Sequence, residues 1–153
     1  MRIALSTQPL THAHLEQIAD QFAMPDLLLP FCGHRKKMPM HQIVRLEGEG
    51  NYTVFHFANG SRLMVSLTLK KLEERLFPKV FVRSHKRNIV NLLYLESIHS
   101  DPTRQHLCVS LVNGDRVDVS RRKMSGFIKL VKGFQQELVA LNATHRLTPR
   151  MVA

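Results

Sequence analysis

Polar and hydrophobic residues alternate along several short segments in the middle of the chain, as in β-strands that bury one face. The segments that predict strands in this way are 43–46, 52–57, 62–65, 80–82, 89–90, 106–112 and 115–119. Residues 27–31 predict an edge strand, because Pro30 cannot donate a hydrogen bond within a sheet. The central part of the chain is therefore expected to be mainly antiparallel β-structure.

Turn-forming residues separate these strands. Asn59-Gly60 and Asn113-Gly114 each lie between two predicted strands, and each predicts a two-residue type I′ turn in which both central residues have positive φ. Residues 47–51 predict a glycine-containing loop, and residues 33–37 predict a basic turn before Pro39.

Helical spacing of apolar residues occurs near both ends of the chain and once between the strands. Residues 11–24 predict a leading helix that ends at Pro25, and residues 66–76 predict a short amphipathic helix that ends before Pro78. A C-terminal helix follows Ser120, its expected N-cap, and residues 142–153 are expected to form a frayed tail. The predicted fold class is thus mainly β with short helices, including a leading helix and a C-terminal helix.

Length and composition fit one domain of ordinary size. The chain has 153 residues, of which 44% are hydrophobic, and this is enough for a core. Cys32 and Cys108 form no CxxC pair, so we expect a reducing compartment and no disulfide. We find no signal-peptide pattern and no stretch of about 18 apolar residues that would span a membrane. The sequence predicts a soluble cytoplasmic protein.

Positive charge is concentrated in the middle of the chain. The formal net charge is +10, and residues 79–135 carry eleven cations and four acids, whereas residues 1–26 carry one cation and three acids. Such a field attracts polyanions. A basic surface that is merely solvated is the alternative, and the clustering weighs against it. A membrane surface is disfavoured as well, because the basic runs do not lie on one amphipathic helix.

Three basic or polar clusters fall in predicted loops, namely residues 48–52, 83–88 and 120–123. The third is unusual, because its cations stand at a helix N-terminus that already carries partial positive charge. A phosphate there would accept hydrogen bonds from free backbone amides and from the cationic side chains together. The alternative is that Asp115 and Asp118 balance these cations.

The second cluster supplies several donors suited to base edges and phosphates within a few residues. The chain has no Trp and two Tyr, so it lacks the aromatic stripe on which unpaired bases stack. Double-stranded DNA is therefore favoured over single strands. An RNA-binding or acidic-partner-binding module without catalytic activity is the alternative, because charge alone does not distinguish these partners.

No catalytic or metal-binding pattern is visible. The sequence contains no HExxH motif, no glycine-rich phosphate loop and no GxSxG motif. His12 and His14 are two positions apart and would not share a helix face, so they do not predict a metal site. We expect no enzymatic activity, no cofactor and no metal.

Four segments in register resemble a LytTR DNA-binding domain. They are 43–53, with Glu47-Gly48-Glu49-Gly50-Asn51-Tyr52; the helix 66–76; 81–91, with Arg83-Ser84-His85-Lys86-Arg87; and 117–122, with Val119-Ser120-Arg121-Arg122. The most specific part is the aromatic-x-Arg-x-His-basic segment that runs into Ile89-Val90-Asn91. The resemblance covers about residues 27–135.

The resemblance implies an elongated antiparallel β fold in which loops enter successive major grooves of bent DNA. By position, the first reading loop is 50–52, the second is 85–87 and the third is 121–123. The resemblance implies base contacts from Asn51, Lys86 and Arg122 or Lys123, phosphate contacts from Arg83, Arg87 and Arg121, and Tyr52 and His85 as further site residues. At Arg87 and Asn88 the sequence departs from the family, where a small hydroxyl residue followed by an aromatic or aliphatic one is usual.

The expected organisation is a short helical extension at 1–26, a LytTR-like domain at 27–135, and the end of the C-terminal helix with its tail at 136–153. Many relatives resemble response regulators with a receiver domain, for which 26 residues leave no room. We expect the leading segment to pack on the core, with dimerisation or docking of a regulatory protein as alternatives. The predicted function is that of a bacterial transcription regulator on double-stranded DNA, with a homodimer on repeated half-sites as a family-based expectation.

Overall fold

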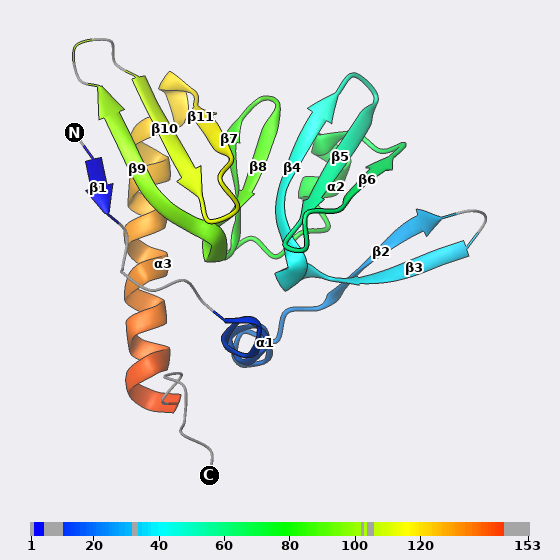
Figure 1. The fold of residues 1–153 in the computed structure, drawn as a ribbon, viewed down its shortest axis with the longest axis horizontal. Helices are drawn as coiled ribbons and strands as arrows, with labels where there is room; N and C mark the ends of the chain where they lie inside the picture. Colours follow the sequence, from blue (N-terminus) through cyan, green and yellow to red (C-terminus); the bar gives the residue numbers. More distant parts are fainter. Residues whose placement is uncertain (1, 5–10, 32–33, 102, 104–105, 146–153) are drawn as a thin grey trace.

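The computed structural model describes residues 2–4, 11–31, 34–101, 103 and 106–145. Within these ranges the strands form three antiparallel sheets, of five, four and two strands, and the helices lie mainly along one side and at one end of the sheets (Figure 1). The predicted class, mainly β with a leading and a C-terminal helix, is confirmed.

The five-stranded sheet has the order β6-β5-β4-β8-β7. Its strands are β4 (Ile43–Glu49), β5 (Tyr52–Phe57), β6 (Arg62–Val65), β7 (Phe81–His85) and β8 (Asn88–Asn91). β4 extends further than predicted, because Glu49 still pairs with Tyr52, so the loop expected at 47–51 shrinks to a tight turn. Two hairpin turns, β4–β5 and β7–β8, therefore point in the same direction at one end of the sheet (Figure 1).

The four-stranded sheet has the order β1-β9-β10-β11. Its strands are β1 (Arg2–Ala4), β9 (Leu95–Asp101), β10 (His106–Leu111) and β11 (Arg116–Val119). Neither β1 nor β9 was predicted from the sequence. Because β1 pairs with β9, the first residues of the chain form part of a sheet and not only of a helical extension.

The third sheet is a two-stranded hairpin of β2 (Asp26–Phe31) and β3 (His34–Pro39). The basic turn predicted at 33–37 is wrong for residues 34–37, which form strand β3 opposite β2. Leu27, Leu29 and Met38 are buried at 9% exposure or less, and they anchor the hairpin to the body. The apolar partner strand therefore fixes an extended conformation that the run of cations alone did not indicate.

The two Asn-Gly hairpins join the expected strands, but their turn type differs from the prediction. Only the glycines have positive φ, +86° at Gly60 and +95° at Gly114, whereas the preceding asparagines do not. Gly60 N–H donates to Phe57 O, and Phe57 N–H donates to Ser61 O. Each loop therefore has three residues, with an ordinary turn followed by a left-handed glycine.

The helices are α1 (His12–Gln21), α2 (Leu69–Glu73) and α3 (Met124–His145), and 3-10 turns are η1 (Met40–Gln42), η2 (Leu92–Tyr94) and η3 (Arg121–Lys123). α2 is shorter than the predicted 66–76 and starts after Thr68, whose hydroxyl accepts from Lys71 N–H. α3 is longer than predicted, since residues 142–145 are helical, and residues 146–153 of the expected tail lie outside the described ranges. Ser120 precedes η3 and makes no side-chain capping bond, so its predicted capping role is wrong.

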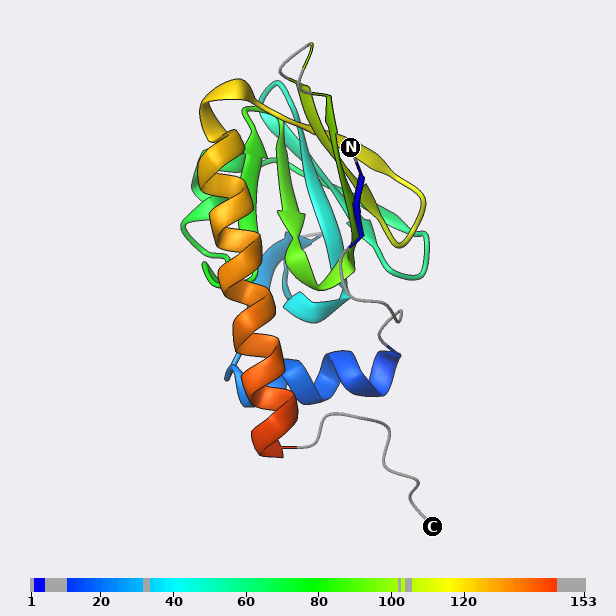
Figure 2. The same cartoon turned by 90° about the vertical axis from the view of Figure 1, so that its left-hand side faces the viewer.

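One continuous core joins these elements. Phe127, Val131 and Phe134 of α3 are buried together with Leu107 and Val109 of β10. α3 runs lengthwise beside the sheets, and α1 lies across their lower end (Figure 2). Leu15 and Ile18 of α1 belong to the same core. The leading helix thus packs on the body, as expected.

Candidate nucleic-acid interface

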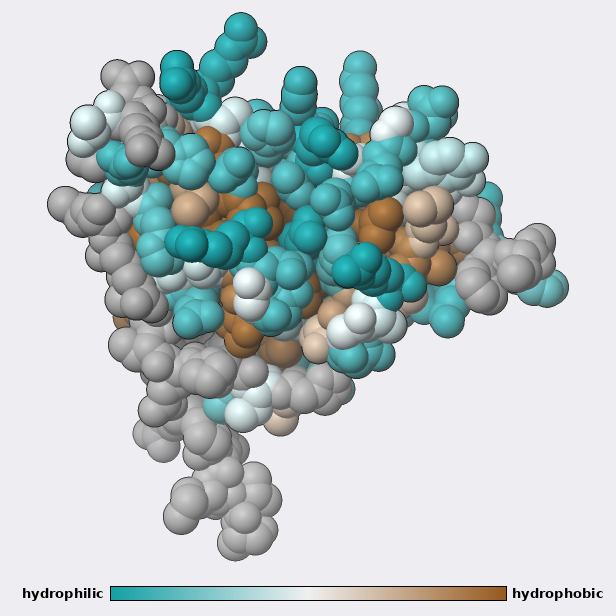
Figure 3. All heavy atoms as spheres, turned by 45° about the horizontal axis from the view of Figure 1, so that its top comes forward, coloured by the Kyte–Doolittle hydropathy of each residue, from teal (hydrophilic) through white to brown (hydrophobic). Residues whose placement is uncertain are grey.

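The three predicted reading loops lie at the same end of the molecule. The β4–β5 turn, the β7–β8 turn and the connection from β11 to α3 stand along the top of Figure 1. With this end turned forward, the surface is mostly hydrophilic, with hydrophobic atoms visible between the polar side chains (Figure 3). The fold therefore brings together three segments that are more than thirty residues apart in the sequence.

The first reading loop is presented by a tight turn. Gly50 has a φ of +61°, a conformation that L side chains rarely adopt, and the exposed Asn51 follows it. Tyr52 begins β5 and has 48% of its surface exposed. Next to it, the buried Thr53 hydroxyl donates to Leu67 O at 2.7 Å and ties β5 to the segment before α2. The loop thus projects from a firmly held base.

Gly48 couples the first reading loop to the second. Its N–H donates to Arg87 O at 2.8 Å, and the Arg87 Nε donates back to Gly48 O at 3.4 Å. A Cβ at position 48 would stand 2.9 Å from Leu69 Cδ1, closer than real Cβ contacts. A side chain at position 48 would therefore push against Leu69 of α2, which packs beneath the two turns.

Arg83 holds the second reading loop in shape. Its Nε donates to His85 O at 3.1 Å, its Nη2 donates to Lys86 O at 2.6 Å, and its Nη1 pairs with Glu73 Oε1 at 2.9 Å. All three guanidinium nitrogens are thus engaged within the protein. The sequence indicated Arg83 as a phosphate contact; in the structure its guanidinium donates to the backbone of the turn that carries Lys86.

The side chains of the second reading loop divide into structural and exposed groups. His85 Nδ1 accepts from Arg87 N–H at 3.2 Å, so a neutral ring carries its proton on Nε2 and offers that atom as a donor. Lys86 and Arg87 are exposed. The exposed Lys86 and Arg87 therefore form a cationic tip, and hydrogen bonds hold the backbone of the turn that carries them.

The third reading loop is a 3-10 turn at the start of α3. Ser120 N–H donates to Ser84 O at 2.9 Å, which joins this loop to β7. Arg121 and Arg122 are exposed and Lys123 is half-buried. Within the described part of the chain, no acidic side chain pairs with these cations: Asp115 bonds Arg45 and Asn113, and Asp118 bonds His106. The predicted alternative, in which those two acids balance the loop, is thus not what the geometry shows.

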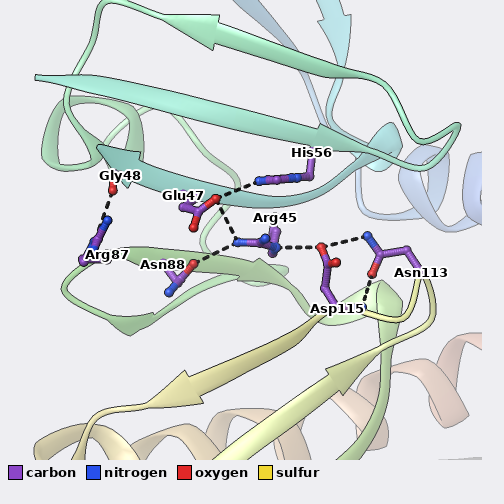
Figure 4. Close-up of polar contacts among 8 residues, drawn as sticks. All are labelled: Arg45, Glu47, Gly48, His56, Arg87, Asn88, Asn113 and Asp115. Atoms are coloured by element: carbon purple, nitrogen blue, oxygen red, sulfur yellow. Dashed lines mark hydrogen bonds and ion pairs between the residues drawn. The ribbon is translucent and has the colours of Figure 1, made fainter. Parts of the chain in front are cut away.

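A polar network behind the loops links the two larger sheets (Figure 4). Arg45 of β4 pairs through Nε with Asp115 Oδ2 at 2.8 Å and donates through Nη1 to Asn88 Oδ1 at 3.2 Å. Glu47 Oε1 lies 3.6 Å from the same Nη1 and 3.1 Å from His56 Nε2. The side chain of Arg45 is only 13% exposed. This residue therefore fixes the β10–β11 turn against β4 and β8.

Burial of Asp115 acts to raise the pKa of its carboxyl group, but the opposing effects are together stronger. Hydrogen bonds from Arg45 and Asn113 favour the ionised form, as do the positive charges of Arg45 and His56. The pKa of Asp115 therefore lies below its ordinary value. The carboxylate stays ionised over a wide pH range and holds Arg45 in place.

Sequence reasoning missed the roles of Gly48, Arg45 and Asp115. Arg45 and Asp115 are 70 positions apart and belong to different sheets, and their contact has no local signal. Gly48 was noted only as a residue of a loop, although a Cβ at this position would meet the Leu69 side chain.

Neither a metal site nor a membrane span stands out in the described ranges. No group of three or more His, Cys, Asp or Glu side chains is placed to bind a metal ion there. In the same part of the chain, no helix has both the length and the apolar character needed to cross a membrane.

Three loops, two of them with exposed cations, stand together at one end of antiparallel sheets, which is an arrangement suited to a DNA-binding module. The family model for the LytTr DNA-binding domain matches residues 34–132. The chain belongs to the LytTR family of DNA-binding domains.

A solved structure supports the same conclusion. It is the LytTr DNA-binding domain of a protein described as a methyl-accepting/DNA response regulator from Bacillus cereus. It is 25% identical in sequence, superposes with a TM-score of 0.59, and the match covers 70% of this chain and 96% of that chain. No curated protein matches the chain.

Replacing Gly48 with Ala is expected to reduce the free energy of unfolding by about 1–3 kcal/mol, because the new methyl group meets Leu69 at 2.9 Å. Urea denaturation measures this loss. The double variant Gly48→Ala, Leu69→Ala is the control, since it removes the atom that the methyl group meets. Its stability should exceed the value expected from adding the two single losses; strict additivity would contradict the close contact.

Proposed function

We propose that this protein binds double-stranded DNA sequence-specifically by inserting its three reading loops into adjacent stretches of the major groove, and that it thereby regulates transcription. The observation that carries the proposal is the gathering of three loops, two with exposed cations, at one end of the molecule. The Bacillus cereus relative is described as a response regulator, and this supports the regulatory part.

The side chains of the loops suggest a division of tasks. Asn51, Lys86 and Arg122 are exposed and Lys123 is half-buried, and we assign Asn51, Lys86 and Arg122 or Lys123 to base edges, where amide and cationic donors discriminate between base pairs. Arg87 and Arg121 are also exposed and would contact phosphates. Tyr52 and His85 flank the first two tips, and they would add a hydroxyl and an Nε2–H donor.

Arg83 receives a different role from the one expected from the sequence. Each of its three nitrogens already donates within the protein, to His85, Lys86 and Glu73, so only the second N–H groups of Nη1 and Nη2 are left for a phosphate. We propose that Arg83 positions Lys86 by fixing the backbone beneath it.

Pairing of two chains on repeated half-sites is part of the proposal. Three turns supply a small contact area, and two copies on one duplex would increase the affinity through effective concentration. Binding to a duplex that carries one half-site or two, measured together with the mass of the complex, tests this point.

Selection from random duplexes is the experiment that tests the proposed function. We expect an enriched motif that is bound about 10³-fold or more tightly than random DNA, with affinity that falls steeply as salt rises.

Asn51→Ala or Lys86→Ala should cost about 1–3 kcal/mol of binding free energy and relax the preference at particular base pairs. Arg121→Ala should weaken all duplexes alike and lower the salt slope by about one.

Two outcomes would contradict this assignment. A selection that enriches no motif would exclude sequence-specific recognition and would leave RNA or an acidic protein as the partner, which the same assay with folded RNA distinguishes. Equal weakening on all sequences by all three variants would show that Asn51 and Lys86 do not contact bases.

A further inference from the structure

The hairpin of β2 and β3 forms an arm that projects from the body. It forms its own two-stranded sheet, and it leaves the molecule on the side of the first reading loop, below the row of loops (Figure 1). The buried Leu27, Leu29 and Met38 hold its base, as an isolated hairpin of this size would be marginally stable. Leu28 of β2 and residues 34–37 of β3 are exposed.

The outer part of the arm is strongly basic. His34, Arg35, Lys36 and Lys37 are consecutive in β3, and all four are exposed. Successive strand residues point to opposite faces, so the ribbon carries cations on both faces. Asp26, at the base, is the single acid on the two strands.

Two hollows between the arm and the body are lined by cationic residues of both. One hollow, of about 500 Å³, is lined by Lys36 and Lys37 on the arm and by Arg62 on β6. Another, of about 480 Å³, is lined by Arg35 on the arm and by Arg75 next to α2. No acid lines the first hollow and Asp26 lines the second. Cationic residues of the arm and of the body therefore line both hollows, with Asp26 among them in the second.

Protection of an exposed strand edge is the simplest explanation of lysines on a hairpin. It accounts for cations along β3, but it does not require Arg62 and Arg75 to stand opposite them. Cations that converge across a hollow repel one another unless an anion lies between them. A polyanion that follows the arm would relieve this repulsion, above all at the first hollow, which no acid lines.

We propose that the β2–β3 arm is an auxiliary DNA-binding element that contacts backbone phosphates of the duplex flanking the recognised motif, on the side of the first reading loop. This rests on the proposed function, since the loops fix where the duplex lies. The arm lies beyond the first reading loop and below the row, so a duplex that bends toward the protein comes within its reach. The contact is to phosphates, so it adds affinity and salt dependence without changing the motif.

The test uses the full chain and the motif obtained by selection, placed in three duplexes. One ends at the motif, and the other two extend it by about 15 base pairs, roughly one and a half helical turns, on one side or the other. The variant Arg35→Ala, Lys36→Ala, Lys37→Ala is compared with Lys79→Ala, Lys129→Ala, Lys132→Ala, which removes the same charge from exposed positions outside the arm and the reading loops.

We expect the wild type to bind one extended duplex more tightly than the short one. On that duplex the arm variant should lose affinity by on the order of ten-fold, and its salt slope should fall by about 2–3. On the short duplex it should match the control variant, and selection should return the same motif. Hydroxyl-radical footprints of the arm variant should shorten on the same side.

Equal losses on short and extended duplexes, or losses no larger than those of the control variant, would overturn the proposal. Unchanged binding by the arm variant on every duplex would also overturn it, and would leave edge protection or an acidic protein partner. Failure of the wild type to select any motif is a separate result, because it contradicts the proposed function before the arm is tested. Thermal unfolding of both variants checks that the arm substitutions leave the core intact.

Discussion

Arg83→Ala is expected to lower the affinity for the selected motif by about 30- to 100-fold, while affinity for random duplex falls much less. The guanidinium donates to two backbone carbonyls of the second reading loop, at His85 and Lys86, and each such charge-assisted bond contributes about 1.5–3 kcal/mol. Without them the turn samples other conformations, and Lys86 must be ordered during binding. Contacts to phosphates tolerate such disorder better than base contacts do. Titration of both duplexes at the same salt concentration gives the ratio.

Arg87→Ala is the matched control for Arg83→Ala. It removes the same charge from the same hairpin, but its exposed side chain makes only a 3.4 Å contact with Gly48 O. It should weaken the motif and random duplexes alike. Arg83→Lys should behave nearly as Arg83→Ala, because a single ammonium cannot reproduce the arrangement of three donors. Uniform weakening by Arg83→Ala would instead support the phosphate contact that the sequence indicated.

The strands around the reading loops were predictable because their signals are local. Alternation gave β5 and β10, and the Asn-Gly pairs marked both hairpins, although the positive φ is confined to Gly60 and Gly114. Strand β9 was missed because Leu95–Asp101 is mostly polar, and it owes its extended form to pairing with β1 and β10. Strand β3 was mistaken for a turn because its run of cations does not indicate a strand. Its extended conformation comes from pairing with β2.

In the candidate site, too, some features could be predicted from the sequence and others could not. The positions of the loops followed from charge and from the family resemblance, and the exposed Asn51, Lys86 and Arg122 lie where the sequence placed them. The supporting contacts did not follow, because they join segments that only the fold brings together, as in the pairs Gly48–Arg87 and Arg45–Asp115. A basic residue near a predicted loop is equally consistent with a DNA contact and with an internal brace. The internal bonds of Arg83 favour the brace, and the comparison of Arg83→Ala with Arg87→Ala tests it.

Arg45→Met is expected to lower the free energy of unfolding by about 2–4 kcal/mol, since it removes a nearly buried partner and leaves Asp115 and Glu47 without their cation. The Asp115 side chain is 33% exposed, so water compensates in part and the lower half of this range applies. Urea denaturation at pH 7 measures the loss. Asp115→Asn in the same background should recover part of it, because the unpaired charge is then gone.

The same pair predicts a pH dependence. The pKa of Asp115 is lowered in the folded state, so the unfolded chain binds a proton at higher pH than the folded one. The stabilisation is therefore complete above the unfolded pKa of about 4, and it is lost as pH falls through the folded pKa. In Arg45→Met the main hydrogen bond and charge that lower this pKa are absent, so stability should fall less steeply between about pH 5 and 3. Parallel profiles for the wild type and the variant would show that the Arg45–Asp115 pair does not couple the two sheets electrostatically.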